Sequence, residues 1–293
     1  MEGPRFGAHM SIAGGPAEAL RRGKSIGCDT IQIFTRPANR WVSRDLTPQE
    51  IAEFERARAE TGIAPIVAHS SYLINLASPD PDLWERSCQA LIIELERCRQ
   101  LGIREYVLHP GSHRGEGIEA GLFRVREALK RALEATAGDD TIIVLETTAG
   151  QGDILGCQLE HLAFLLHNIT PRERLGICVD TAHLLAAGYE FRHAAAYAAF
   201  WEEFDRLLGR EALRVIHVND SKRDLGSQVD RHEHLGRGFL GLEALRLLVN
   251  DRSLWHVPMI LETPKGPTME EDVRNLALLR SLVEPSFAIT PTS

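Results

Sequence analysis

Six short apolar segments of this chain each end on a side chain that can bind a metal ion. These side chains are His69, His109, Glu146, Asp180, His217 and Glu262. Each segment has the length and composition of a buried strand, so each of these side chains is expected at the carboxyl end of a strand. If the strands are parallel neighbours, the six imidazoles and carboxylates meet at one place. The pattern therefore predicts a metal site at one edge of a parallel sheet.

Strand-like and helix-like segments alternate along the whole chain. The strand-like segments span residues 5–9, 30–35, 65–69, 105–109, 141–146, 176–180, 214–218 and 257–262. The helical patterns span residues 16–26, 47–60, 81–101, 121–135, 159–168, 193–208, 242–251 and 269–283. Eight such units without a Pro/Gly/Ser-rich linker predict one α/β domain, a single (β/α)8 TIM barrel over residues 1–284. Residues 285–293 are expected to be a flexible C-terminal tail.

A doubly wound parallel sheet is the alternative architecture. It would be expected to carry a glycine-rich phosphate-binding turn after its first strand, and Gly14-Gly15 does not supply one. A barrel also places its active site at the carboxyl ends of its strands, where the six metal-binding side chains fall. We therefore expect the barrel.

The composition indicates where the protein acts and which atoms hold the metal. The five cysteines are odd in number and form no Cys-x-x-Cys pair, which is typical of reduced thiols in the cytoplasm. The metal ligands are therefore expected to be nitrogen and oxygen atoms and not thiolates. No apolar run is long enough to cross a membrane and the N-terminus lacks the pattern of a signal peptide, so a cytoplasmic protein is expected. The net charge of −8 disfavours nucleic-acid binding through a basic surface, although bound divalent ions would reverse the sign locally.

Three further metal-binding side chains lie close to these strand ends. His183 follows Asp180 by three residues, and Asp230 and His232 stand at alternate positions of one segment. A lone histidine at a strand end is more often structural than a metal ligand, but here nine imidazoles and carboxylates occur together. Nine ligands are too many for one zinc ion and suit a cluster of two or three ions. Imidazole with carboxylate favours zinc or manganese, and closely spaced ions are typical of phosphoester hydrolysis.

The residues around these nine side chains carry longer motifs. They are residues 69–76 (HSSYLINL), 109–113 (HPGSH), 146–152 (ETTAGQG), 176–183 (GICVDTAH), 217–222 (HVNDSK) and 230–233 (DRHE). Together with the opening residues 7–11 (GAHMS), these motifs resemble the endonuclease IV family of abasic-site DNA repair nucleases. The resemblance covers nearly the whole chain and includes all nine positions.

The resemblance implies three zinc ions per chain, which manganese could replace. The first would be held by His69, His109 and Glu146, the second by Glu146, Asp180, His217 and Glu262, and the third by His183, Asp230 and His232. Glu146, as the bridge, and Glu262 are expected to be the catalytic carboxylates. The implied substrate is duplex DNA with abasic sites or blocked 3′ ends. A monomeric enzyme would hydrolyse the phosphodiester 5′ to the abasic site, leaving a 3′-OH and a 5′-deoxyribose phosphate.

Six residues near the expected barrel mouth are candidates for contacting this DNA. Tyr72 and Leu73 follow the ligand His69 and could insert into the base stack as an apolar wedge. The others are Arg36, Asn39, Arg40 and Arg231. The loop at residues 35–41 departs from the family pattern, in which an arginine stands one place earlier. Two further departures are Thr147 and Ala182, where relatives carry asparagine and cysteine.

Two other functions fit parts of this pattern. A metal-dependent sugar isomerase or epimerase on the same barrel also gathers these residue types at strand ends. It needs only one or two ions, and neither the Asp230–His232 pair nor an exposed Tyr72–Leu73 wedge. A non-catalytic DNA-damage-binding barrel would be expected to have lost ligands, and none is missing.

Three further histidines, His9, His113 and His234, lie near the expected barrel mouth. They are expected to support ligands through hydrogen bonds, or to be exposed, rather than to bind metal.

Overall fold

The computed structural model describes residues 3–284 and forms a closed barrel of eight parallel strands. The strands are β1 (Arg5–Met10), β2 (Thr30–Phe34), β3 (Ile66–His69), β4 (Glu105–Leu108), β5 (Ile142–Glu146), β6 (Leu175–Asp180), β7 (Leu213–His217) and β10 (Pro258–Leu261). They follow one another around the barrel in chain order, and β1 pairs with β10 to close it. The predicted TIM barrel is confirmed, and each observed strand end lies within one residue of the predicted one. Residues 285–293, the predicted tail, lie outside the described residues.

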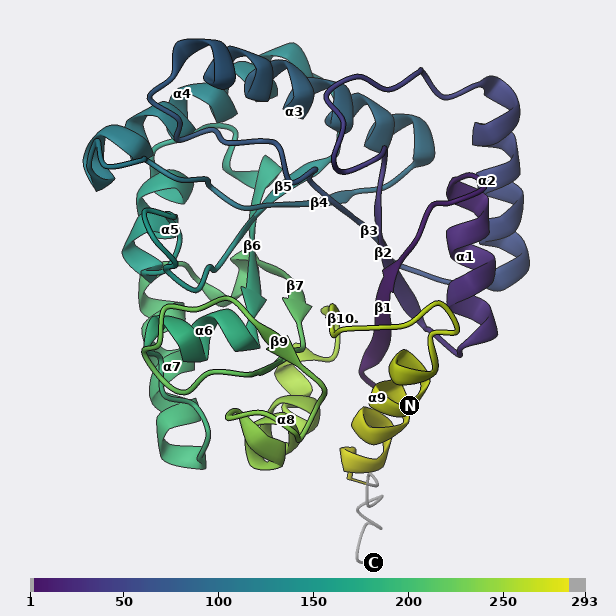
Figure 1. Cartoon of the computed structure of the whole chain (residues 1–293), viewed down its shortest axis with the longest axis vertical. Coiled ribbons are helices and arrows are strands. Elements are labelled where there is room, and N and C mark those ends of the chain that lie inside the picture. The colour runs from purple at the N-terminus through teal and green to yellow at the C-terminus, as the bar shows by residue number, and fades with distance from the viewer. Residues whose placement is uncertain (1–2, 285–293) are drawn as a thin grey trace, which may run out of the picture.

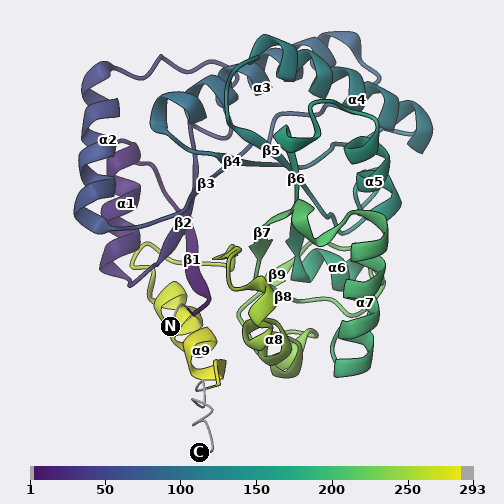
Figure 2. The same cartoon turned by 180° about the vertical axis from the view of Figure 1, so that it is seen from behind.

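Helices form an outer ring around the strands, as Figures 1 and 2 show from opposite sides. They are α1 (Pro16–Ser25), α2 (Pro48–Thr61), α3 (Pro81–Leu101), α4 (Ile118–Ala135), α5 (Leu159–His167), α7 (Ala194–Leu207), α8 (Gly241–Asn250) and α9 (Glu270–Leu282). Short 3₁₀ turns, η1 (Arg172–Arg174), η2 (Arg210–Ala212) and η3 (Arg252–Leu254), precede β6, β7 and β10. Thr47 and Glu50 form a capping box that fixes the start of α2, and Asp80 caps α3. No helix of the described residues is long and apolar enough to cross a membrane.

The inner face of the barrel carries its own layer of mostly small apolar side chains. The layer consists of Val67, Val107, Ile142, Val144, Cys178, Val215 and Ile260, all of them buried. The alternate strand residues, such as Ala68 and Leu145, belong to the larger core between strands and helices. Because the residue two places further along a strand points to the same face, each strand-end ligand stands directly above a member of the inner layer. The six predicted ligands therefore form the next layer, at the carboxyl end of the barrel.

Two elements of the structure do not follow from the sequence pattern. Helix α6 (Thr181–Ala187) starts directly after β6, and Asp180 caps it by accepting the backbone N–H of His183 at 2.8 Å. A two-stranded antiparallel sheet, β8 (Asp220–Ser221) with β9 (His232–Glu233), follows β7. Both elements are too short to show a period in the sequence. Each of them nevertheless carries a predicted ligand, His183 on α6 and His232 on β9.

Candidate metal centre

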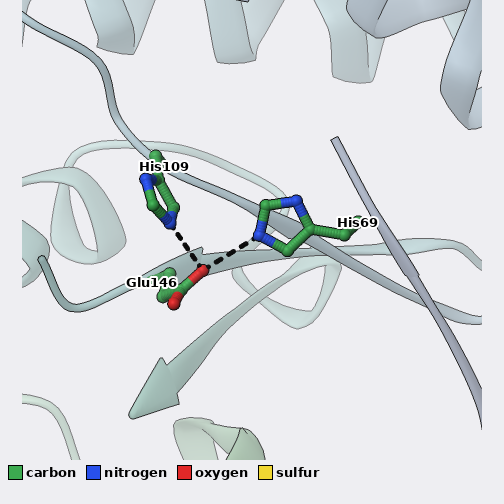
Figure 3. Close-up of side chains that lie close together, drawn as sticks. All are labelled: His69, His109 and Glu146. Atoms are coloured by element: carbon green, nitrogen blue, oxygen red, sulfur yellow. Dashed lines mark hydrogen bonds and ion pairs between the residues drawn. The ribbon is translucent and has the colours of Figure 1, made fainter. Parts of the chain in front are cut away.

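His69, His109 and Glu146 meet at the carboxyl ends of β3, β4 and β5, as Figure 3 shows. Nε2 of His69 lies 3.1 Å from Oε2 of Glu146, and Nε2 of His109 lies 2.9 Å from the same oxygen. The other ring nitrogen of His69 lies 2.9 Å from the carbonyl oxygen of Ser70. Donating to that carbonyl leaves Nε2 as the nitrogen that can bind a metal. Three ligands with one side open to solvent are typical of a catalytic rather than a structural metal site.

The second carboxylate oxygen of Glu146 faces a second group of ligands. Oε1 lies 2.9 Å from Nδ1 of His217, and the same nitrogen lies 3.2 Å from Oε2 of Glu262. Asp180 completes this group, in which one ligand atom from each residue lies within 4.8 Å of all the others. Glu146 thus belongs to both groups and gives one oxygen to each. This is the arrangement of a carboxylate that bridges two ions.

The third group lies beside the second and comes from α6 and from the segment that leads into β9. Nε2 of His183 lies 3.2 Å from Oδ2 of Asp230, and Nε2 of His232 lies 3.5 Å from Oδ1 of Asp230. Oδ2 of Asp180 lies 3.7 Å from the same His232 nitrogen, so Asp180 stands between the second and third groups. The pairing of β8 with β9 fixes the position of His232. The structure therefore brings all nine predicted ligands into one connected cluster.

The cluster has the donor set of a site that takes cations. Among the described side chains, Nε2 of His183 and Nε2 of His232 are buried without a hydrogen-bond partner, although carboxylates stand close by. Burial alone would lower the pKa of His183, but Asp180 and the neighbouring carboxylates raise it well above its usual value. Burial would likewise raise the pKa of Glu146, yet the imidazoles around it, His109 first, hold it well below its usual range. Imidazole nitrogens and carboxylate oxygens held this close together fit zinc or manganese.

Gln32 on β2 supports two of the ligands, although its role was not predicted from the sequence pattern. Its Oε1 lies 2.7 Å from Nε2 of His217, and its Nε2 donates to Oε1 of Glu262 at 2.6 Å. By accepting from Nε2, Gln32 leaves Nδ1 of His217 as the nitrogen that faces the ligand cluster. The same amide nitrogen lies 3.0 Å from Nδ1 of His9 on β1. The available signal is a lone glutamine inside a strand-like segment.

Asn219 and Thr147 hold further ligands in place. Asn219 donates from Nδ2 to Oδ2 of Asp180 at 2.6 Å, and its Oδ1 accepts the backbone N–H of Glu262 at 2.8 Å. Oγ1 of Thr147 accepts the backbone N–H of Asp180 at 2.9 Å, and its carbonyl oxygen lies 2.8 Å from Nδ1 of His183. Thr147, one of the departures from the family pattern, therefore supports two ligands. Both residues stand one or two places after a strand-end ligand, which is the signal that could have identified them.

A cavity of about 740 Å³ opens above the cluster. Tyr72 and Leu73 line this cavity together with the ligands His69, His109, His183, Asp230, His232 and Glu262. Tyr72 is 76% exposed, and its ring packs edge-on against Phe34 with the ring centroids 5.2 Å apart. Asn39, Arg40 and Arg231 are exposed as well. An accessible aromatic side chain beside the metal ligands suits the predicted wedge, and contact of these residues with DNA stays a prediction.

Arg36 does not suit its predicted role as a phosphate contact. Its side chain is 1% exposed, and its Nε donates to Oε1 of Glu94 on α3 at 2.6 Å. The remaining guanidinium nitrogens donate to the carbonyl oxygens of Arg40 and Trp41 and to the hydroxyl of Ser71. A guanidinium that is buried and occupied in this way cannot reach a phosphate. The prediction for Arg36 is therefore wrong.

Known proteins are similar to this chain in both sequence and fold. Residues 20–282 match the family model described as "Xylose isomerase-like TIM barrel". The "Probable endonuclease 4" of Chloroflexus aggregans is 54% identical over 285 residues, which span 97% of this chain and 100% of that protein. The "Probable endonuclease 4" of Geobacter sulfurreducens is 47% identical over 95% of this chain and 94% of that protein. The crystal structure of endonuclease IV from Thermus thermophilus superposes with a TM-score of 0.84 at 38% identity, covering 95% of this chain and 98% of that one.

The chain belongs to the endonuclease IV family. The resemblance drawn from its motifs is thereby confirmed. A D-tagatose 3-epimerase-like protein also superposes, with a TM-score of 0.73 over 95% of this chain, but at 18% identity. That likeness shows a shared barrel and no more. The sugar isomerase alternative is therefore supported by the fold alone, whereas both sequence and fold support membership of the endonuclease IV family.

Proposed function

We propose that this protein is a metal-dependent endonuclease that hydrolyses the phosphodiester 5′ to abasic sites in duplex DNA. The products are a 3′-OH and a 5′-deoxyribose phosphate, and the same site also trims blocked 3′ ends. The observation that carries the proposal is Glu146, which gives one carboxylate oxygen to each of two ligand groups, with the third group alongside. The relatives named endonuclease 4 support this choice.

The donor set is proposed to hold three zinc ions, which manganese can replace. His69, His109 and Glu146 hold the first, while Glu146, Asp180, His217 and Glu262 hold the second. His183, Asp230 and His232 hold the third ion, and Asp180 lies between the second and third ions. When bound, closely spaced divalent ions generate a nucleophile from water and stabilise the charge that develops on the phosphate oxygens. Such ions also explain how a chain of net charge −8 takes a polyanionic substrate.

The residues around the cavity position the substrate. Gln32 and Asn219 keep the carboxylates and imidazoles turned toward the centre through the hydrogen bonds described above. Tyr72 and Leu73 enter the base stack next to the lesion, where pairing is already lost and extrusion of the sugar costs least. Asn39, Arg40 and Arg231 contact the backbone or the gap left by the missing base. A monomer acting on chromosomal DNA in the cytoplasm is sufficient for this role.

The test is incision of a duplex that holds a single tetrahydrofuran abasic analogue. Zinc-loaded protein is expected to cut the strand once, 5′ to the analogue, and to leave the opposite strand intact. The same duplex without the analogue is the control for non-specific cleavage. Metal analysis is expected to give close to three ions per chain. One ion per chain together with ketose–aldose interconversion would overturn the proposal in favour of a sugar isomerase.

A further inference from the structure

A buried ion pair holds together the two segments that carry most of the proposed DNA contacts. These are the 35–41 segment, with Asn39 and Arg40, and the 70–75 segment, with Tyr72 and Leu73. The pair joins Arg36 to Glu94 of α3, and each side chain is 1% exposed. Burying two charges costs free energy unless further hydrogen bonds satisfy both groups.

The cation is satisfied by the 35–41 segment itself. One terminal nitrogen of Arg36 donates to the carbonyl oxygens of Arg40 and Trp41, each at 2.8 Å. The segment thus curls back over its own guanidinium, and Arg40 is held by its backbone while its side chain stays exposed. Arg97 of α3 adds a hydrogen bond from its Nε to the carbonyl oxygen of Thr35 at 2.7 Å.

The anion is satisfied by the 70–75 segment. Oε2 of Glu94 accepts the backbone N–H of Ser71 at 3.1 Å and the hydroxyl of Tyr106 at 2.7 Å. The hydroxyl of Ser71 in turn accepts from Arg36 at 3.2 Å. One residue further on, the backbone N–H of Tyr72 donates to the carbonyl oxygen of Ala38 at 3.1 Å, which ties the 70–75 segment directly to the 35–41 segment.

We propose that the Arg36–Glu94 pair is a positioning device that locks both segments into the one arrangement that reads an abasic site. Neither residue touches the DNA; both act through Arg40, Ser71 and Tyr72. The inference rests on the proposed function, because it concerns how that substrate is selected. A lysine at position 36 would keep the charge but lose the planar fork that reaches two carbonyl oxygens, a hydroxyl and a carboxylate at once.

The test compares Arg36→Lys with Arg174→Lys in zinc-loaded protein. Arg174 is also buried and donates to backbone carbonyl oxygens, those of Thr136 and Thr141, but it lies just before β6, at the amino end of the barrel. Two substrates are used: an abasic duplex, and bis(p-nitrophenyl) phosphate, which is expected to react at the metals without the duplex contacts of Asn39, Arg40 and Tyr72. Arg36→Lys is expected to raise KM for the abasic duplex by about tenfold to a hundredfold, because misplaced binding groups cost this much. Its turnover of the small diester and its metal content should match those of Arg174→Lys.

Equal losses on both substrates, or no loss on the duplex, would overturn the inference. Glu94→Gln provides a second variant, with the same split expected. A measurement on the unaltered protein needs no variant at all: the amides of Ser71 and Tyr72 should exchange with solvent slowly, although the Tyr72 side chain is exposed. Fast exchange at both amides would also overturn the inference. Failure of the unaltered protein to incise any abasic duplex would instead overturn the proposed function, so the two failures are distinguishable.

Discussion

Gln32 lies beside His217, one of the nine ligands of the cluster, with Gln32 Oε1 2.7 Å from His217 Nε2. The imidazole can donate there only if its proton is on Nε2, so the contact determines which nitrogen faces the cluster. The amide of the same glutamine donates to Glu262. One neutral side chain therefore orients a nitrogen ligand and an oxygen ligand of the same group.

Replacing this glutamine is expected to weaken metal binding before it affects anything else. Gln32→Leu keeps the volume but removes both hydrogen bonds, and loss of such supporting contacts lowers metal affinity by about 10- to 100-fold. Competition with a zinc chelator measures this directly. Gln89→Leu, on the exposed face of α3, is the matched control. An unchanged zinc affinity in Gln32→Leu would show that His217 and Glu262 are oriented by other contacts.

Glu262→Gln is expected to abolish incision while the protein still binds abasic duplex. The amide keeps the shape and the contact with Gln32 but no longer carries the negative charge that the second ligand group needs. We expect the rate of incision to fall by more than about a hundredfold, beyond the usual loss for a supporting residue. Single-turnover incision and a gel-shift titration measure the two properties separately. Undiminished cleavage would remove Glu262 from the catalytic site.

Tyr72→Ala is expected to weaken the preference for abasic over intact duplex. Stacking of a base on an aromatic ring contributes about 1–3 kcal/mol, so the ratio of the two dissociation constants should fall by about tenfold. Phe123→Ala, which removes a partly exposed aromatic ring on α4, is the control and should leave the ratio unchanged. If both variants behave alike, Tyr72 is not the wedge.

Metal removal is expected to reverse the effect of pH on stability. In the metal-free protein the pKa of His183 is raised above 6.5 by Asp180 and its neighbours against the opposing effect of burial. The stability from this protonated imidazole is present below pH 6.5 and is lost as the pH rises through the raised value. In the metal-loaded protein the ions replace those protons, so metal affinity and stability rise with pH. Thermal unfolding between pH 6 and 9, with and without chelator, measures both trends; parallel trends would contradict the assignment of His183 as a ligand.

A feature of the fold or of the site could be predicted from the sequence when a short stretch of neighbouring residues determines it. The barrel strands are buried on both faces, so they read as apolar runs, and the ligands are visible because a charged or imidazole group ends each run. His183 and His232 were identified from their spacing to other ligands, although the short elements that carry them, α6 and β9, were not. Seven residues of helix and two of strand are too few for a periodic signal.

Arg36 and Gln32 were misjudged or missed for a different reason. A charged side chain on a loop is normally exposed, and only the partner Glu94, 58 residues further along the chain, makes the burial of Arg36 possible. Gln32 meets His217 across 185 residues of sequence. Contacts between residues so far apart in the sequence form only when the barrel closes. A single sequence predicts the barrel as a fold class but does not predict which side chains meet in it.

The inner layer of the barrel has a consequence for how the chain can vary. Each strand-end ligand stands two residues beyond an inner apolar side chain, from Val67 before His69 to Ile260 before Glu262. Inserting a single residue between such a pair would turn the ligand toward the helices and an apolar side chain toward the cluster. Insertions after the ligand would leave its direction unchanged. Length variation among homologous chains should therefore be absent from the two-residue steps that aim the ligands, whereas the segments beyond the strand ends, where the substrate is read, can vary in length.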